Sequence, residues 1–429
     1  MRAALTDRRP LAVPAFRRWW TASLVTAVGG SFSVVAVPAQ LYATTGTSAA
    51  LGGSAVLSFA GLVIGALTAG TLADRWDRRR VLLAAQTGLA MTYAALWALA
   101  VAEGPLLILL ALVTCQGLTF GAISATTGAV LPRLLPQELL AAGNSLSSLV
   151  RYGGWILGPL LGGLLIPVAG LSTLYLCDAV ALLAVLRAVH RLPPMPPAAE
   201  SRSGRDDGGP GSSSTSGDPA GRDGGGLRDG FRHLRTSRLL MAVLAVDLAA
   251  MVLGMPVVLF PELARETYGD PAGGGPVLGL FYAAYPAGVL LAGLFSGTFT
   301  RIRRSGRAMA AAATAWGVTV VLLGVTAHLW VALGALVLGG AVNFVLSTHR
   351  NAITQAHTDD ALRGRVQGLL TVVLTGGPQL ANLLHGAAGA WIGPRPAIVA
   401  GGLLTVIAVA ATRRAVPELG TAAEAPDLE

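Results

Sequence analysis

Hydrophobic residues gather in long runs separated by short polar segments along nearly all of the 429-residue chain. A run of about 20 apolar residues crosses a bilayer as a helix, so each run predicts one membrane-spanning helix. The runs predict helices at 17–43, 50–73, 80–102, 105–131, 139–168 and 171–191, then at 238–261, 276–299, 307–327, 329–355, 364–391 and 395–415. We therefore expect an all-α membrane protein with twelve transmembrane helices in two six-helix bundles.

A long polar stretch, Pro193 to Gly226, separates the two groups of helices and is rich in Gly, Ser, Asp and Arg. Such a segment cannot bury apolar surface, so we expect it to be disordered. After it, Leu227, Phe231 and Leu234 would share one face of a helix. This spacing fits a short amphipathic helix on the membrane as well as the solvated end of a linker. The predicted units are a bundle at 1–191, a cytoplasmic linker at 192–237, a bundle at 238–416 and a tail at 417–429.

The composition agrees with a membrane protein, since 53% of the residues are hydrophobic and 12% are charged, against about 25% charged in soluble domains. All 31 basic residues are Arg, and 27 of them fall in the N-terminus, the even-numbered loops and the C-terminus. The positive-inside rule then places both termini in the cytoplasm. We expect a multi-pass protein of a bacterial inner membrane, and an Arg pattern that reflects topology rather than nucleic-acid binding.

Cofactor and enzyme signatures are missing from the sequence. Cys115 and Cys177 lie in apolar runs, which indicates neither a disulfide nor a metal site. There is no phosphate-binding loop, dinucleotide fingerprint or Gly-x-Ser-x-Gly elbow. We therefore expect neither an enzyme nor a cofactor.

The two groups of helices also repeat each other. Gly70–Thr71 before one Arg-rich loop corresponds to Gly297–Thr298 before another, and 150–154 resembles 373–377. Two repeated halves are the arrangement by which alternating-access transporters place a substrate site near the bilayer midplane.

Residues 70–80 read Gly-Thr-Leu-Ala-Asp-Arg-Trp-Asp-Arg-Arg-Arg, which resembles the signature of the major facilitator superfamily between helices two and three. A plain positive-inside loop would explain the arginines but not Gly70, Leu72 and Asp74 together. The resemblance implies close helix packing at Gly70 and a conformational latch in which Asp74 pairs with the start of helix eleven. The implied latch residues are Gly70, Leu72, Asp74, Arg75, Arg78, Arg79, Arg363 and Arg365. Asp77 stands where the family has Gly.

The fifth predicted helix carries Gly-Trp-Ile-Leu-Gly-Pro-Leu-Leu-Gly-Gly at 154–163. This segment is similar to the antiporter motif of drug/proton exporters in the same superfamily and implies export. Glycines four apart make a smooth packing face, and a proline allows a bend, so tight packing without a transport role is the alternative. The motif residues are Gly154, Gly158, Pro159, Gly162 and Gly163.

A wider resemblance covers most of the chain outside the linker and tails. Segments 14–17, 35–40, 72–75, 279–284 and 363–368 look like the enterobactin exporter branch of the superfamily. Members of that branch export catecholate siderophores across the inner membrane using the proton gradient. The resemblance implies a proton-coupled exporter of a siderophore or a similar metabolite. A broad drug/proton efflux pump is the alternative, and a non-transporting receptor on the same fold is a third hypothesis.

Ionisable residues inside predicted spans are candidates for substrate binding or proton coupling, because charge in hydrocarbon is costly. Arg151 could attract an anionic or catechol-bearing substrate, regulate a nearby acid, or bond backbone carbonyls. Asp247 and Asp178 are the two carboxylates well inside the spans, and we favour Asp247 for coupling, since Asp178 fits equally well as a structural hydrogen-bonding group. His349 and Arg350 lie nearer the cytoplasmic end, where an interfacial anchor is the expected role.

Other residues fit a substrate cavity. Aromatic rings at Tyr152, Trp155, Tyr282 and Tyr285 suit stacking on an aromatic substrate or packing between helices. Gln379, Asn382 and His385 fall in helix eleven, although a lone His is more often satisfied by a neighbouring helix. The expected partners are a small-molecule substrate, protons and the lipid bilayer, with no nucleic acid, and we expect a monomer.

Overall fold

The computed structural model describes residues 9–73, 75–127, 134–191, 235–271, 273–299, 304–358 and 360–421, all in helices and short connections without a strand. Residues 192–234 of the predicted linker (192–237), including the amphipathic segment at 227–234, lie outside the described residues, and so does Asp74.

The N-terminal half contains six membrane spans. α1 (Pro14–Gly29) and α2 (Ser33–Thr45) form the first, after a 3₁₀ turn at Arg9–Ala12. The next three are α3 (Ser48–Ala73), α4 (Arg78–Val101) and α5 (Leu106–Thr127). After a 3₁₀ turn at Gln137–Leu139, α7 (Leu140–His190) holds the fifth and sixth spans, because the chain reverses at Gly170, whose φ of 76° favours glycine.

The C-terminal half repeats this order. α10 (Arg238–Val252), a 3₁₀ turn at Val257–Leu259 and α11 (Phe260–Tyr268) form the seventh span. The remaining five are α12 (Pro276–Leu294), α14 (Ser305–Val325), α15 (Leu329–Ala356), α16 (Asp360–Ile392) and α17 (Pro394–Ala415), with short helices α13 (Ser296–Phe299) and α18 (Glu418–Thr421). The twelve predicted spans are therefore confirmed.

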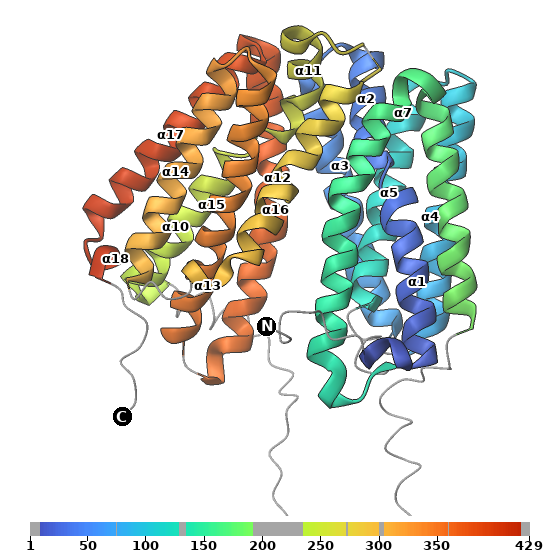
Figure 1. Ribbon diagram of the computed structural model, residues 1–429, viewed down its shortest axis with the longest axis horizontal. Coiled ribbons are helices and arrows are strands. Elements are labelled where there is room, and N and C mark those ends of the chain that lie inside the picture. Colours follow the sequence, from blue (N-terminus) through green and yellow to red (C-terminus); the bar gives the residue numbers. More distant parts are fainter. Residues whose placement is uncertain are drawn as a thin grey trace, which may run out of the picture.

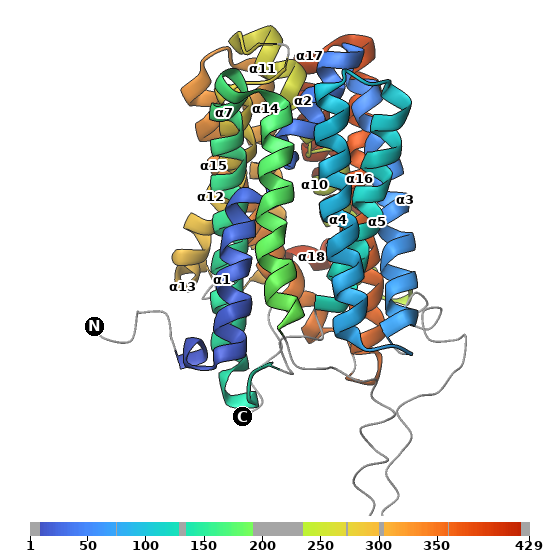
Figure 2. The same cartoon turned by 90° about the vertical axis from the view of Figure 1, so that its right-hand side faces the viewer.

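The two halves lie side by side, one blue to green and the other yellow to red (Figure 1). They converge at the end where α2 and α11 lie, called here the closed end, and diverge toward the end where α1 begins. Figure 2 shows the molecule with its N-terminal half toward the viewer, and the spans of that half run nearly parallel to one another.

Small residues bring matching helices together in both halves. A Cβ on Gly65 of α3 would overlap the backbone at Leu118 of α5, and a Cβ on Gly288 of α12 would overlap the backbone at Val337 of α15. Lipid is as apolar as a leucine side chain, so close backbone approach and van der Waals contact hold such helices together. The second and fourth spans of one half thus pack like the eighth and tenth of the other, in agreement with the sequence repeat.

The first span of each half is broken, whereas the sequence predicted continuous helices at 17–43 and 238–261. α1 ends at Gly29 and α2 begins at Ser33, and α10 ends at Val252 before the 3₁₀ turn that follows Pro256. The sequence does place helix-breaking residues at both points: Gly29 and Gly30 in the first span, and Gly254 and Pro256 in the seventh. Backbone groups freed inside a membrane need partners, and these partners shape the centre of the molecule.

Candidate functional site

A cavity of about 260 Å³ lies between the two helix breaks. Ser31 and Val34 line it from the break in the first span, and Met255, Pro256 and Val257 line it from the break in the seventh. Discontinuous helices at a repeat interface are where transporters of this architecture build substrate sites. The break residues therefore mark this cavity as a candidate binding site.

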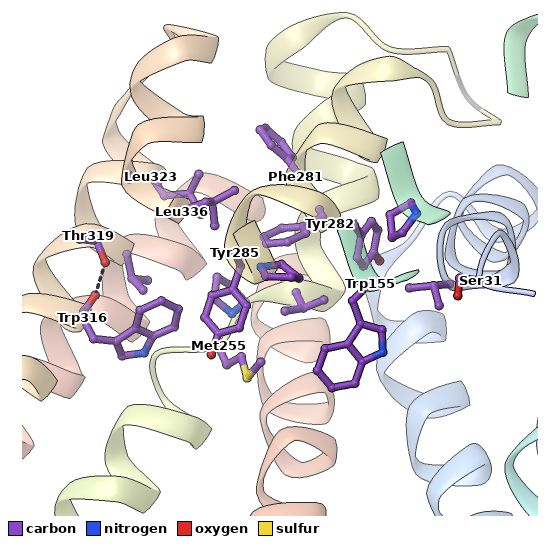
Figure 3. A pocket seen from close by; sticks show the side chains of 18 residues that line it. Ser31, Trp155, Met255, Phe281, Tyr282, Tyr285, Trp316, Thr319, Leu323 and Leu336 are labelled. Atoms are coloured by element: carbon purple, nitrogen blue, oxygen red, sulfur yellow. Dashed lines mark hydrogen bonds between the residues drawn. The ribbon is translucent and has the colours of Figure 1, made fainter. Parts of the chain in front are cut away.

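Aromatic rings from both halves are part of the cavity wall. Trp155 of α7 comes from the N-terminal half, and Tyr282 and Tyr285 of α12 come from the other half (Figure 3). Trp316 of α14 meets Tyr285 edge to face, with ring centroids 5.6 Å apart. Flat π faces on two sides of one space suit a planar aromatic ligand.

Arg151 places a positive charge beside Trp155, which lines this cavity. Its guanidinium carbon lies 5.6 Å from the ring centroid of Tyr152 and 5.9 Å from that of Trp155. Trp155 is 49% exposed, and Arg151 is exposed as well. Arg151 also donates to the Ser148 hydroxyl at 3.3 Å. A stacked and accessible guanidinium can attract an anionic group or cover an aromatic ring, and no carbonyl contact is seen for it among the described residues.

A second cavity of about 300 Å³ adjoins the first, and both are lined by Val34, Val257 and Tyr282. We call the two together the central chamber. The polar residues around the second cavity are Ser33, Ser54, Ser58, Gln116, Gln379 and Asn382. The chamber thus has an aromatic part and a part with hydroxyl and amide groups, and the structure places the predicted Gln379 and Asn382 in the latter.

Asp178 lies behind the break in the first span. Its carboxylate accepts the backbone N–H of Phe32 at 3.1 Å and that of Ser33 at 2.7 Å, and its side chain is fully buried. It therefore caps the first turn of α2, where unpaired N–H groups would otherwise face hydrocarbon. This contact is the structural hydrogen-bonding role that the sequence left open for Asp178.

His385 performs the matching task at the break in the seventh span. Its Nε2 lies 3.0 Å from the Leu253 carbonyl oxygen, so Nε2 carries the hydrogen. The indole of Trp316 donates to the Ala250 carbonyl at 3.0 Å. His385 is 5% exposed and does not line either cavity. Two carbonyls at the end of the broken helix thus accept hydrogen bonds, one from Trp316 in the ninth span and one from His385 in the eleventh.

A buried ion pair joins the seventh and tenth spans. Arg350 of α15 donates from Nη1 to both carboxylate oxygens of Asp247, each at 3.0 Å, and the two residues are 7% and 1% exposed. Arg350 also contacts the Asn351 side chain at 3.3 Å. The expectation of an interfacial anchor at Arg350 was wrong. The guanidinium is buried because it pairs with Asp247, which lies about 100 positions away in sequence.

The antiporter-type motif packs α7 against two partners. Gly154 contacts Ala27 and Gly158 contacts Ser31 so closely that a Cβ at either glycine would overlap them. A Cβ on Gly163 would lie 2.6 Å from the Cα of Gly279 in the other half. The remaining members are Pro159, whose carbonyl faces Gly279, and Gly162, which has ordinary contacts. The motif therefore supports both the broken first span and the contact between halves.

Only part of the predicted latch can be placed. Asp74 and the side chains of Arg363 and Arg365 lie outside the described residues. In this conformation no close packing is seen at Gly70 among the described residues, since a Cβ there would meet none of their atoms within 4 Å. The reason is that the halves diverge at this end of α3 (Figure 1).

Other latch residues have partners within the N-terminal half. Arg79 donates to the His190 carbonyl and so binds the end of α7. Arg75 and Leu72 line a groove formed by residues of α3, α4 and α5. Leu72 is 39% exposed. Arg78 is the first residue of α4.

Comparison with known proteins agrees with this architecture. A family model described as Major Facilitator Superfamily matches residues 19–378. The enterobactin exporter of Shigella boydii is 26% identical over 398 residues, covering 92% of this chain and 90% of the relative. That of Shigella flexneri is 27% identical over 402 residues, with the same coverage.

Solved structures share the fold. A bacterial homologue of the human lysosomal transporter Spinster, in an inward-facing and unoccupied conformation, gives a TM-score of 0.68 at 14% identity, covering 97% of this chain and 99% of that one. A D-xylose–proton symporter gives 0.66 at 14% identity, with coverage of 95% and 98%. The chain belongs to the Major Facilitator Superfamily of membrane transporters, and it is similar over most of its length to enterobactin exporters.

Proposed function

We propose that this transporter is a proton-coupled exporter of a siderophore or a similar small secondary metabolite, working by alternating access in a bacterial inner membrane. The observation that carries the proposal is the central chamber, because residues of both halves line it at the two helix breaks. Its aromatic faces suit ring stacking, and Arg151 beside Trp155 suits an anionic ring such as a catecholate. Similarity to enterobactin exporters supports the same substrate class.

Proton coupling is assigned to Asp247. Protonation would neutralise its charge and release Arg350, so that α10 and α15 could shift relative to each other. In this cycle, protons enter down their gradient while the substrate leaves. Asp74 closes the cytoplasmic end by pairing with Arg363 or Arg365. Both termini face the cytoplasm, and one chain suffices for transport.

Transport into proteoliposomes tests the proposal directly. Purified protein is reconstituted, a pH gradient is imposed, and movement of enterobactin is measured with and without a protonophore. We expect gradient-dependent transport that the protonophore abolishes. Transport of no candidate substrate under any gradient would contradict the proposal and favour a receptor on this fold.

A broad drug/proton efflux pump is the second candidate, favoured by the largely apolar wall of the first cavity and by the antiporter-type motif. Deletion of the gene separates the two functions. Accumulation of an intracellular siderophore supports the first candidate, whereas sensitivity to many unrelated drugs supports the second.

A further inference from the structure

At the closed end, a side-chain hydrogen bond crosses from one half to the other. Ser48, the first residue of α3, donates from its hydroxyl to Oε2 of Glu262 in α11. Ser48 is fully buried, and Glu262 is 7% exposed. One helical turn further along α11, the guanidinium carbon of Arg265 lies 5.8 Å from the ring centroid of Tyr42 in α2. Two residues of α11 thus bind the N-terminal half.

The Glu262 carboxyl is buried, and no described cation is paired with it. Among the described residues the ion pair of the C-terminal half is Asp247 with Arg350, and Glu262 has no such partner. Arg265 points to Tyr42 instead. A buried carboxylate without a counter-charge is costly, whereas a neutral carboxyl needs only hydrogen bonds, and a hydroxyl can supply one as donor or acceptor.

The surroundings add no compensating charge. Glu266, one turn from Glu262 on α11, is exposed and carries the same sign. On α17, Arg395 donates to the carbonyls of Gly324 and Val325 and is thus held elsewhere. The remaining titratable groups near α11 are Tyr42 of α2, Tyr268 at its own end, Asp270 after it and Tyr282 of α12, which packs on Phe260.

We propose that Glu262 is a proton-binding site of the closed end, at which the bound proton holds the two halves together. When Glu262 is neutral, its bond to Ser48 keeps α11 against α3. When the proton leaves, the buried negative charge favours the conformation in which water reaches Glu262 and the halves separate. This inference rests on the proposed function for alternating access alone, and it is independent of the substrate.

The proton comes from the side of the membrane opposite the termini, which the Arg pattern identifies as the outside. External acid therefore closes the outer end and favours the state open at the other end. An exporter that runs on proton entry needs this order, because the carrier must return to load substrate after it has taken up a proton.

Distance measurement between two spin labels tests the site. The labels are placed at Thr44→Cys in α2 and Thr267→Cys in α11, in a Cys115→Ser/Cys177→Ser background, in nanodiscs without substrate. From acidic to alkaline buffer, the population with a long separation should rise roughly two- to tenfold, the range for one net hydrogen bond. Glu262→Gln, which cannot ionise, should keep the acidic distribution at both pH values, and Glu266→Gln should behave as wild type.

Two results would overturn the proposal: a wild-type distribution that does not respond to pH, or a Glu262→Gln variant that responds as the wild type does. Ser48→Ala provides an independent check if Glu262→Gln fails to fold. Loss of the donor should enlarge the long-distance population in acid, and an unchanged distribution would contradict the role of this bond. Because no substrate or gradient is present, failure here leaves the export proposal standing, and failure of export leaves this test valid.

Discussion

Arg350 and Asp247 lie on different spans, yet the guanidinium Nη1 is 3.0 Å from each oxygen of the carboxylate, inside the C-terminal half. Neither charge can lose its partner without leaving the other buried and uncompensated. Under the proposed function, a proton on Asp247 would leave Arg350 without its counter-charge, and α15 could then shift relative to α10.

Asp247→Asn should both destabilise the protein and uncouple transport. The amide cannot balance Arg350, and breaking a buried pair costs about 3–5 kcal/mol. We expect a lower melting temperature in detergent, and transport in proteoliposomes that no longer follows the imposed pH gradient.

The matched control for this substitution is the double variant Asp247→Asn/Arg350→Gln, which removes both charges. It should recover much of the lost stability without recovering proton coupling. Transport by Asp247→Asn that still responds to the pH gradient would assign the coupling role to another residue.

Arg151→Gln should weaken binding of an anionic catecholate more than binding of a neutral aromatic drug. The substitution removes the charge beside Trp155 while leaving the stacking rings in place. A cation–π or charge contact of about 1 kcal/mol corresponds to roughly a fivefold change in Kd. Titration calorimetry with enterobactin and with a neutral drug measures both.

Arg151→Lys keeps the charge and serves as the control for the Gln variant, since it loses only the planar stacking surface. Equal losses of affinity for the two ligands in Arg151→Gln would count against an anionic substrate and in favour of the drug efflux pump.

Asp178→Asn should reduce stability and leave proton coupling intact. Phe32 N–H and Ser33 N–H each bond a different carboxylate oxygen, and Asn replaces one of these oxygens by an NH₂ donor that faces a backbone N–H. One unsatisfied buried donor costs about 1–3 kcal/mol. Thermal unfolding and gradient-driven transport, measured on the same preparation, check the two parts. Loss of pH-driven transport at normal stability would mean that Asp178 carries the proton.

The fold followed from hydropathy because each span must be apolar and helical in lipid. Most of the twelve predicted ranges match the helices within a few residues, whereas the seventh, predicted at 238–261, extends through α11 to Tyr268. The breaks in the first and seventh spans were missed, since Gly29–Gly30 and Gly254 with Pro256 also occur in continuous membrane helices. A break depends on partners such as Asp178 and His385, and these come from distant segments of the chain.

Pairings across the chain were equally hard to predict. Asp247 and Arg350 were each recognised as polar residues in predicted spans, but nothing local indicates that they meet. Ser48 and Glu262 gave even less signal, because one opens a helix and the other follows an apolar run as loop residues do. Part of the central chamber was predicted, because polar and ring-bearing positions among small residues are conspicuous in a membrane helix. The predicted lining residues are Trp155, Tyr282, Tyr285, Gln379 and Asn382, whereas Phe260, Phe281, Trp316 and Gln116 were not predicted.

Asp74→Asn should impair transport while leaving membrane insertion intact. The amide cannot form the charged latch with Arg363 or Arg365 that the superfamily signature implies. The control is Asp77→Asn in the same loop, where Asp77 accepts the Arg79 backbone N–H as the N-cap of α4. Transport rates, normalised to the amount of inserted protein, should fall for Asp74→Asn and stay near wild type for Asp77→Asn. Wild-type rates in both variants would remove the latch.

Asp270 provides a pH test in the connection before α12. Its carboxylate accepts the Leu278 N–H at 2.8 Å and the Val277 N–H at 3.3 Å, yet burial raises the pKa of this side chain above its ordinary value, outweighing the two donors. A raised folded-state pKa means that the contribution of Asp270 to stability is full in acid and declines as the pH rises. Asp270→Asn cannot ionise, so its melting temperature should rise relative to that of wild type as the pH increases above about 4, the ordinary pKa of an Asp side chain. The melting-temperature difference between variant and wild type could instead stay constant with pH or change in the opposite direction. Either result would contradict a raised pKa, because the two N–H donors would then stabilise the carboxylate at least as much as burial destabilises it.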